Sequence, residues 1–208
     1  MMSSGEKIKL EKAQTIAATV LGLIADVCDQ VVIAGSVRRR RLEVGDIEIV
    51  ALPKDARALN ARLDKLVIDR VISRAAYGKE LSHRWGEKYR GFTYEGVRVE
   101  VFTADVDNWG YILWLRTGPG DANQYVMMMC SQKDAPYRAK NGYWWHDGRK
   151  LHVANETEMF RLLGMNVVPP PLRKVDAYQQ HFRNFRWGDA AECVYAEMIT
   201  DPSQLGLW

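Results

Sequence analysis

Residues suited to binding phosphate and residues suited to binding metal ions lie close together near the start of the chain. Gly35-Ser36 follows the apolar run Val31–Ala34 and leads into four consecutive arginines, Arg38–Arg41. A glycine lets backbone N–H groups approach a phosphate, and the serine hydroxyl adds a donor. Guanidinium groups bind the same anions through charge-assisted hydrogen bonds. This stretch therefore predicts an anion-binding turn.

Acidic residues follow on two segments that have the pattern of strands. Asp46 and Glu48 flank the start of the β-branched run 47–52, and their spacing of two places both on one face of a strand. In 97–102, three valines alternate with Arg98, Glu100 and Phe102, so Glu100 lies on the face opposite the valines. If the two strands pair in register, three carboxylates converge. Such a cluster suits Mg²⁺ and two-metal phosphoryl transfer, with ions about 3.5–4 Å apart.

These motifs resemble the palm of the family-X (DNA polymerase beta-like) nucleotidyltransferases, with Glu100 in the place of the third palm carboxylate. Trp109-Gly110 and Arg116-Thr117-Gly118, followed by Asn123, resemble the junction between palm and thumb in that family. Two later segments, 155–165 and 169–173, resemble the end of the thumb. The resemblance covers roughly residues 10–174, with motifs at three separate places in the same order.

The resemblance implies an α+β fold, in which the palm is a mixed sheet with covering helices and the thumb is a small α/β unit. The expected limits are 1–116 for the palm with its leading helix, 117–174 for the thumb, and 175–208 for a C-terminal extension of unknown role. Only one helix precedes the first palm strand in this sequence. A palm-plus-thumb layout of this kind is similar to the small viral and phage members of the family.

The resemblance also implies a DNA-directed DNA polymerase that adds dNMP to a primer 3′-hydroxyl, in short-gap filling or repair. Its cofactors are two Mg²⁺ or Mn²⁺ ions, and its partners are a DNA primer-template and dNTP. Asp46 would bridge both ions, Glu48 would help to hold them, and Glu100 would bind one ion and assist deprotonation of the hydroxyl. By motif position Arg39 is the triphosphate ligand and Arg38 the more structural arginine. The remaining nucleotide-binding residues are Gly35, Ser36, Gly45, Thr117, Gly118 and Asn123.

Departures from the family pattern leave other functions open. The family has aspartates in the places of Glu48 and Glu100, and a glutamate carries its carboxylate one methylene further from the backbone. Met127 stands where family members often have a basic or polar thumb residue, which argues against stringent base selection. One alternative is a nucleotidyltransferase acting on tRNA, a small molecule or a protein. Another is a catalytically silent module that binds DNA ends.

Composition and charge limit the remaining possibilities. The chain has 208 residues, of which 47% are hydrophobic, so it is long enough to bury a substantial core. It contains no apolar run of ~18 residues and no signal-peptide pattern, so a soluble, cytoplasmic monomer without membrane contact is expected. Its net charge of +3 is only mildly basic, so a DNA-binding surface must come from local clusters. The residues assigned to that surface are Lys79, Arg84, Lys88, Arg90, Arg138 and Lys140.

Hydrophobic periodicity predicts the elements that position these residues. Helical spacing predicts helices over 7–28 and 55–74, and two more within 105–133 that break at 117–120. The polar, basic stretch 75–91 is predicted to be a loop over the cleft. Two turn dipeptides, Asn141-Gly142 and Asp147-Gly148, are typical of hairpins, and the second is predicted to join 143–146 to 149–153. Three widely spaced cysteines, Cys28, Cys130 and Cys193, indicate buried thiols.

Overall fold

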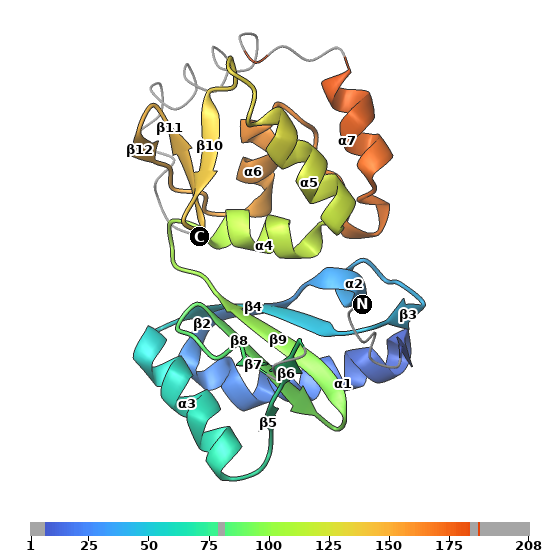
Figure 1. Cartoon of the computed structure of the whole chain (residues 1–208), viewed down its shortest axis with the longest axis vertical. Coiled ribbons are helices and arrows are strands. Elements are labelled where there is room, and N and C mark those ends of the chain that lie inside the picture. Colours follow the sequence, from blue (N-terminus) through green and yellow to red (C-terminus); the bar gives the residue numbers. More distant parts are fainter. Residues whose placement is uncertain (1–6, 79–81, 184–186, 188–208) are drawn as a thin grey trace.

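A computed structural model describes residues 7–78, 82–183 and 187. The chain forms two lobes that lie one above the other in Figure 1, and a short segment after residue 103 connects them. The N-terminal lobe, residues 7–103, contains the largest sheet, and the C-terminal lobe, residues 109–182, is mainly helical with a small sheet at one side. The α+β class predicted from the sequence is confirmed.

The N-terminal lobe is built on a five-stranded mixed sheet with the strand order β2-β4-β9-β8-β5. Only β4 and β9 run parallel, and every other neighbouring pair in this sheet is antiparallel. The strands of the sheet are β2 (Cys28–Ile33), β4 (Ile47–Pro53), β5 (Ser73–Arg74), β8 (Tyr89–Tyr94) and β9 (Val97–Thr103). The other elements of the lobe are β1 (Ile8–Lys9), α1 (Leu10–Ile24), η1 (Ala25–Val27), α2 (Gly35–Arg38), β3 (Glu43–Val44), α3 (Ala56–Ile68), β6 (Ala76–Tyr77) and β7 (Ser82–His83).

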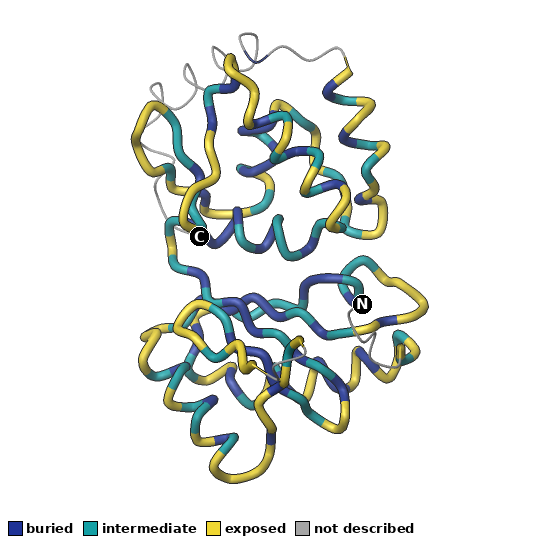
Figure 2. The backbone as a smooth tube through the Cα atoms, in the orientation of Figure 1, coloured by how far each residue is buried: buried dark blue, intermediate teal, exposed yellow. Residues whose placement is uncertain are grey.

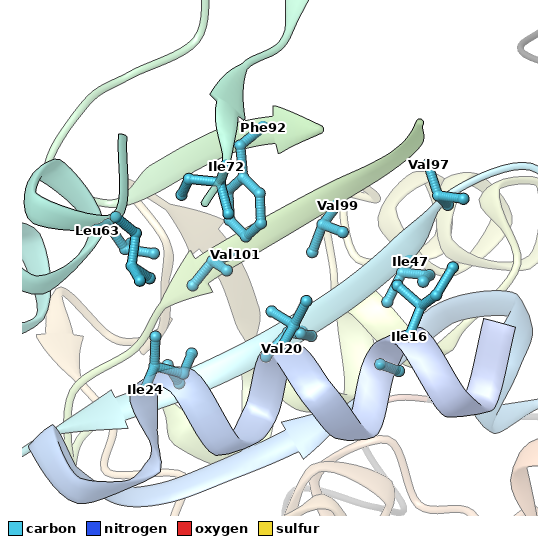
Figure 3. Close-up of a cluster of buried hydrophobic side chains, with 14 of the residues drawn as sticks. Ile16, Val20, Ile24, Ile47, Leu63, Ile72, Phe92, Val97, Val99 and Val101 are labelled. Atoms are coloured by element: carbon cyan, nitrogen blue, oxygen red, sulfur yellow. The ribbon is translucent and has the colours of Figure 1, made fainter. Parts of the chain in front are cut away.

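Helices α1 and α3 cover one face of this sheet. Alternate residues of β4 and β9 point toward these helices, which is the period of two that a half-buried strand requires. Figure 3 shows the resulting cluster between α1 and the sheet, and its labelled members are buried (Figure 2). They are Ile16, Val20, Ile24, Ile47, Leu63, Ile72, Phe92, Val97, Val99 and Val101. The opposite face of β4 and β9, which carries the acidic residues, is therefore the face turned away from α1 and α3.

The C-terminal lobe has a core of its own, rich in aromatic residues. Tyr111 and Trp114 of α4 pack there with Trp144, and Tyr178 and Phe182 close the same cluster from the last helix. The elements of the lobe are α4 (Trp109–Thr117), α5 (Gly120–Met129), β10 (Tyr137–Lys140), β11 (Tyr143–His146), β12 (Arg149–Lys150), α6 (Glu156–Leu162), η2 (Pro170–Leu172) and α7 (Val175–Phe182).

Helix α4 contacts both lobes. Its Trp109 and Leu113 pack in a third, smaller cluster with Val50 and Leu52, which belong to the acidic face of β4. Two other residues of the same helix belong to the core of the C-terminal lobe. The domain limits expected from the sequence, with a boundary at 116, therefore divide a helix that joins the two cores, and they stay a prediction.

Several predicted elements are confirmed and others are shorter. The helix predicted over 7–28 is α1 with the short 3₁₀ turn η1, and the helix predicted over 55–74 ends at Ile68. The break at 117–120 separates α4 from α5 as predicted. Aromatic residues of α7 pack on the core of the C-terminal lobe, whereas Cys193 lies outside the described residues. Cys28 and Cys130 are buried free thiols, as predicted.

Both predicted hairpin turns are present. Asn141-Gly142 and Asp147-Gly148 have positive φ at both positions, as a type I′ turn requires, and they join β10 to β11 and β11 to β12. The last strand ends at Lys150, three residues earlier than predicted. Asn155 caps α6 by accepting a hydrogen bond from the Glu158 N–H at 2.9 Å, and Gly164, with φ +64°, follows the helix.

The prediction of a loop over residues 75–91 is wrong. Strands β6 and β7 form a small hairpin there, and β8 begins at Tyr89 and joins the main sheet. Gly78 has φ +68° and lets the chain turn after Tyr77, which a polar composition alone does not reveal. The described residues of this stretch, 75–78 and 82–91, are therefore hydrogen-bonded to one another and to the main sheet.

Within the part of the chain that the structure describes, no helix is long and apolar enough to cross a membrane. The longest helix, α1, has 15 residues and is amphipathic.

The close contact between α4 and α6 gives a stability prediction. A Cβ at Gly110 would overlap the backbone of Asn155, which cannot move without displacing the start of α6. We expect Gly110→Ala to lower the free energy of unfolding by ~1–3 kcal/mol in urea denaturation. The control is Gly22→Ala, because Gly22 lies inside α1 with open space around it and should gain up to ~1 kcal/mol of helix propensity. Equal effects of the two substitutions would contradict this packing.

Candidate functional site

Three acidic residues lie near one another on the face of the sheet that α4 approaches. Ile47 and Ile49 point into the core beneath α1, so Glu48 between them lies on the opposite face. Parallel pairing of β4 with β9 places Glu48 directly opposite Glu100. The in-register pairing on which the sequence prediction depended is confirmed, and Asp46 lies two residues before Glu48 on the same face.

Burial is the largest influence on the pKa values of two of these carboxylates, Glu48 and Asp46. Burial raises the pKa of Glu48 to about 7, and repulsion from Asp46 and then Glu100 adds to this effect, against the attraction of Arg116 and Arg39. Burial also raises the pKa of Asp46, and repulsion from Glu100 is the next cause, although two nearby arginines oppose it. The positive charges present do not offset the cost of holding the acids ionised, so the cluster favours an added cation.

The turn after β2 lies against this acidic cluster. Gly35 has φ +59°, and a Cβ there would overlap the carboxylate of Glu48, so glycine is required both by conformation and by space. The next residue, Ser36, has a buried hydroxyl oxygen. Arg39 follows the four-residue helix α2 and its Nη1 donates to the carbonyl of Thr117 at 2.7 Å. The turn therefore reaches from the sheet to the end of α4.

Residues from the junction of α4 and α5 complete this corner. The side-chain amide of Asn123 donates to the carbonyl of Leu115 at 2.6 Å and to that of Gly118 at 3.3 Å. A Cβ at Gly118 would overlap the Asn123 Oδ1, so the two residues are in close contact. The structure thus brings Thr117, Gly118 and Asn123 together beside Arg39.

Arg38 connects the two lobes through the same corner. Its guanidinium donates to the Thr117 hydroxyl at 2.6 Å and to Glu156 at 2.5 Å. Glu156 in turn accepts from the buried Arg173 at 2.6 Å. This chain of contacts joins α2, α4, α6 and the segment after η2, which agrees with the structural role predicted for Arg38.

Four buried polar atoms in this region lack a hydrogen-bond partner among the described residues. They are Ser36 Oγ, Arg39 Nε, Arg116 Nε and Asn123 Oδ1. A buried polar atom left unpaired costs about 1–3 kcal/mol, so such atoms are uncommon without a ligand or water to satisfy them. Three of the four can donate hydrogen bonds, which suits a ligand rich in acceptor oxygens, such as a phosphate chain.

Gly45 is placed differently from the other predicted nucleotide-binding residues. It is exposed and lines a separate pocket of about 340 Å³ together with Lys12 and Arg98. Neither Ser36 nor Arg39 lines this pocket. Gly45 directly precedes Asp46, so its backbone conformation affects where the Asp46 side chain lies.

The carboxylate of Glu100 has neighbours that the sequence did not indicate. Tyr77 donates to Glu100 Oε1 at 3.1 Å, and Tyr89 donates to the Tyr77 hydroxyl at 3.0 Å. Glu100 also lines an open pocket of about 160 Å³ with Tyr89, Arg116 and other residues. The third acid is therefore accessible from one side and hydrogen-bonded on the other.

The donor chemistry of the cluster fits divalent cations, while its side chains are held apart. Three carboxylates on neighbouring strands are the oxygen ligands that Mg²⁺ and Mn²⁺ prefer. Within the described ranges, however, no three His, Cys, Asp or Glu side chains stand together as a set that could hold a metal ion. Glu48 lies against Gly35 and Glu100 is hydrogen-bonded to Tyr77, so two different neighbours hold these carboxylates.

The candidate DNA contacts divide into two groups. Arg84, Lys88 and Lys140 are exposed, and the Arg84 guanidinium lies 4.6 Å from the ring centre of Tyr77. Lys79 lies outside the described residues. The exposed group forms a basic rim from the β6–β7 hairpin to the β10–β11 hairpin.

Arg90 is used within the fold, and we withdraw it from the predicted DNA contacts, whereas Arg138 is exposed and stays a predicted contact, although its guanidinium also binds the backbone. Arg90 is 8% exposed, is bonded to Asp64 at 2.8 Å, and lies 4.6 Å from the ring centre of Trp85. The guanidinium of Arg138 donates to four backbone carbonyls, those of Cys130, Gln132, Ala135 and Tyr137. Sequence clusters of basic residues cannot distinguish a guanidinium facing solvent from one bound to the backbone.

Sequence reasoning missed Tyr77 and gave no role to Arg98 or Arg116. Arg98 alternates with Glu100 along β9, and this spacing of two was a signal that it shares the acidic face. The guanidinium carbon of Arg116, a residue of α4, lies 3.7 Å from the ring centre of Phe102. This contact depends on how the lobes pack. Tyr77 had no signal, because its position depends on the hairpin at Gly78.

Comparison with known proteins supports the fold assignment. No protein-family model matches the chain, and no curated protein sequence matches it. Among the solved structures, the chain is similar to polymerase beta of Leishmania infantum in a ternary P/T complex, with a TM-score of 0.65 and 16% identity over 82% of this chain and 78% of that one. The chain has the polymerase beta-like nucleotidyltransferase fold.

The raised pKa of Glu48 predicts a pH dependence of stability when metal is removed. Glu48 keeps its proton in the folded state up to a pKa of about 7, whereas the ordinary value is 4.5. Its contribution to the free energy of unfolding is therefore fully present below pH 4.5 and is lost as the pH rises to 7. The loss should be on the order of 3 kcal/mol for this group. Urea denaturation in EDTA between pH 5 and 7 should show a flatter dependence for Glu48→Gln than for the wild type. Identical slopes would mean that Glu48 titrates normally.

Proposed function

We propose that this chain is a nucleotidyltransferase that adds dNMP to the 3′-hydroxyl of a primer under the direction of a DNA template. The observation that carries the proposal is the placement of Asp46, Glu48 and Glu100 on one sheet face, facing a corner with unpaired hydrogen-bond donors. The similar Leishmania structure is a ternary P/T complex, which supports primer and template as partners.

In this proposal the three carboxylates hold two Mg²⁺ or Mn²⁺ ions. Asp46 would be a ligand shared by both, Glu48 would help to hold them, and Glu100 would bind one and assist deprotonation of the hydroxyl. Bound ions of this kind activate the attacking oxygen and stabilise the leaving oxygen of an in-line displacement. Burial, together with repulsion from neighbouring carboxylates, raises the pKa of Glu48 and Asp46, and an added cation would offset this cost of holding the acids ionised.

The chain's own residues then bind and orient the reactants. Ser36 and Arg39 donate to the triphosphate, and Gly35 keeps the turn close enough for the backbone to approach it. The primer 3′-oxygen attacks the α-phosphorus. The bond between the α-phosphorus and the oxygen that bridges to the β-phosphate breaks, and pyrophosphate leaves. Glu100 accepts the proton of the attacking hydroxyl at its carboxylate. Thr117, Gly118 and Asn123 shape the pocket for sugar and base.

The DNA would lie along the exposed basic rim of Arg84, Lys88 and Lys140. These residues belong to both lobes, so a duplex on this surface passes the acidic cluster between them. Short-gap filling, and the palm-plus-thumb layout similar to small viral and phage members of the family, belong to the same proposal.

Removing the acid shared by both ions should abolish transfer. We expect Asp46→Asn to reduce primer extension with Mg²⁺ or Mn²⁺ by roughly 10³-fold or more, because no neighbouring carboxylate replaces the bridging ligand. The control is Asp29→Asn, an exposed aspartate of β2, which should extend primers within twofold of the wild type. Extension by Asp46→Asn within tenfold of the wild type would sink the assignment.

Binding of DNA should depend on salt and on the basic rim. Log affinity should fall against log salt by ~0.9 per neutralised phosphate, and Arg84→Ala should reduce this slope by about one contact. Arg57→Ala is the matched control, since Arg57 is exposed on α3, which covers the other face of the sheet. Fluorescence anisotropy at several salt concentrations measures both. A flat salt response of the wild type would favour an acceptor other than DNA.

A further inference from the structure

We infer that Tyr77 is a positioning residue, whose hydroxyl fixes the carboxylate of Glu100 for the ion on the primer side. This inference rests on the proposed function, since it concerns how one of the three acids is held. It assigns a role in the site to the β6–β7 hairpin, the segment for which the sequence predicted only a loop.

The hydrogen bonds around Glu100 run in one direction. Tyr89 donates to the hydroxyl of Tyr77 at 3.0 Å, and Tyr77 donates to Glu100 Oε1 at 3.1 Å. Burial raises the pKa of both tyrosines above the ordinary value, so both hydroxyls keep their protons at neutral pH. A carboxylate is the final acceptor of such a chain. Glu100 Oε1 thereby accepts from Tyr77, and the same carboxylate is among the causes that raise the pKa of Tyr89.

The sheet leaves space for this contact. Gly91 of β8 lies directly opposite Glu100 of β9, and a Cβ at Gly91 would overlap the hydroxyl of Tyr77. The three atoms nearest to that Cβ position all belong to Tyr77. The missing side chain at Gly91 therefore makes the place in which the tyrosine reaches the acid.

Two arginines hold the ring of Tyr77 in place. The guanidinium carbons of Arg84 and Arg98 lie 4.6 and 4.9 Å from its ring centre, within the range of cation–π attraction. Arg98 comes from the same strand as Glu100, and Arg84 comes from the segment that follows the hairpin. The ring is thus bound to the strand that carries the acid, so its hydroxyl is held independently of the carboxylate.

A glutamate at this position needs such support more than an aspartate does. It has one more rotatable bond, so its carboxylate samples more positions and loses more conformational entropy when it is fixed. Residues that hydrogen-bond to a ligating carboxylate orient it, and their loss typically costs 10- to 100-fold in metal affinity or activity. Tyr77 supplies this orientation for Glu100.

The test compares Tyr77→Phe with Tyr94→Phe. Tyr77→Phe keeps the ring between the two arginines and removes only the hydroxyl. Tyr94, at the end of β8, makes no side-chain hydrogen bond to a described residue and serves as the matched control. Mn²⁺ binding is measured from the free Mn²⁺ signal in electron paramagnetic resonance, and kcat and KM for dNTP are measured by primer extension.

We expect Tyr77→Phe to bind Mn²⁺ at least tenfold more weakly and to lose at least tenfold in kcat, with KM for dNTP within threefold of the wild type. Tyr94→Phe should match the wild type in all three. Gly91→Ala, which displaces the Tyr77 hydroxyl while keeping the tyrosine, should show the same loss as Tyr77→Phe. Thermal melting of each variant checks that it is folded.

Two results for the variants would overturn the inference, and one result for the wild type, given last, would do so as well. The first is Mn²⁺ binding and kcat unchanged in both Tyr77→Phe and Gly91→Ala, and the second is tighter binding, which would mean that Tyr77 holds Glu100 away from the ion. Failure of the proposed function has a different signature, because the wild type itself would then extend no primer. Mn²⁺ binding by the wild type and its variants would still decide the role of Tyr77, and a wild type that bound no Mn²⁺ would contradict it.

Discussion

The repulsion among three carboxylates on one sheet face is the constraint on which the rest of the site depends. Parallel pairing of β4 and β9 sets Glu48 opposite Glu100, and the entry into β4 adds Asp46. Burial prevents water from screening these charges, so the pKa of Glu48 rises to about 7. The hydrophobic cluster under α1 fixes the register of β4 and β9, because a shift of one residue would turn the buried isoleucines and valines outward.

The other elements gather around this cluster at the boundary between the lobes. Arg38 and Arg39 reach from the turn after β2 to Thr117 at the end of α4, and Arg38 continues to Glu156 of the C-terminal lobe. The unpaired donors lie in the same corner. An anionic ligand bound there would contact both lobes and the acids at once, which is how a nucleotide would be oriented between a turn on the sheet and a helix above it.

Local patterns predicted the parts of this site that depend on strand periodicity. The alternation in 97–102 and the apolar run 47–52 gave the faces of β9 and β4, and the break at Gly118 gave the junction of α4 and α5. Contacts made through tertiary folding had no such pattern. The placement of Tyr77 depends on a hairpin at Gly78 and on an empty position at Gly91, and the burial of Arg90 depends on Asp64 of a distant helix.

The central claim is that Asp46, Glu48 and Glu100 together hold divalent ions. The most direct test is a crystal of the protein with primer-template and a non-hydrolysable dNTP, soaked in Mn²⁺ and measured at the manganese absorption edge. Anomalous peaks are expected between these three carboxylates, at the face of the sheet beneath α4. Anomalous density that is absent from this face, or that lies beside other residues, would contradict it.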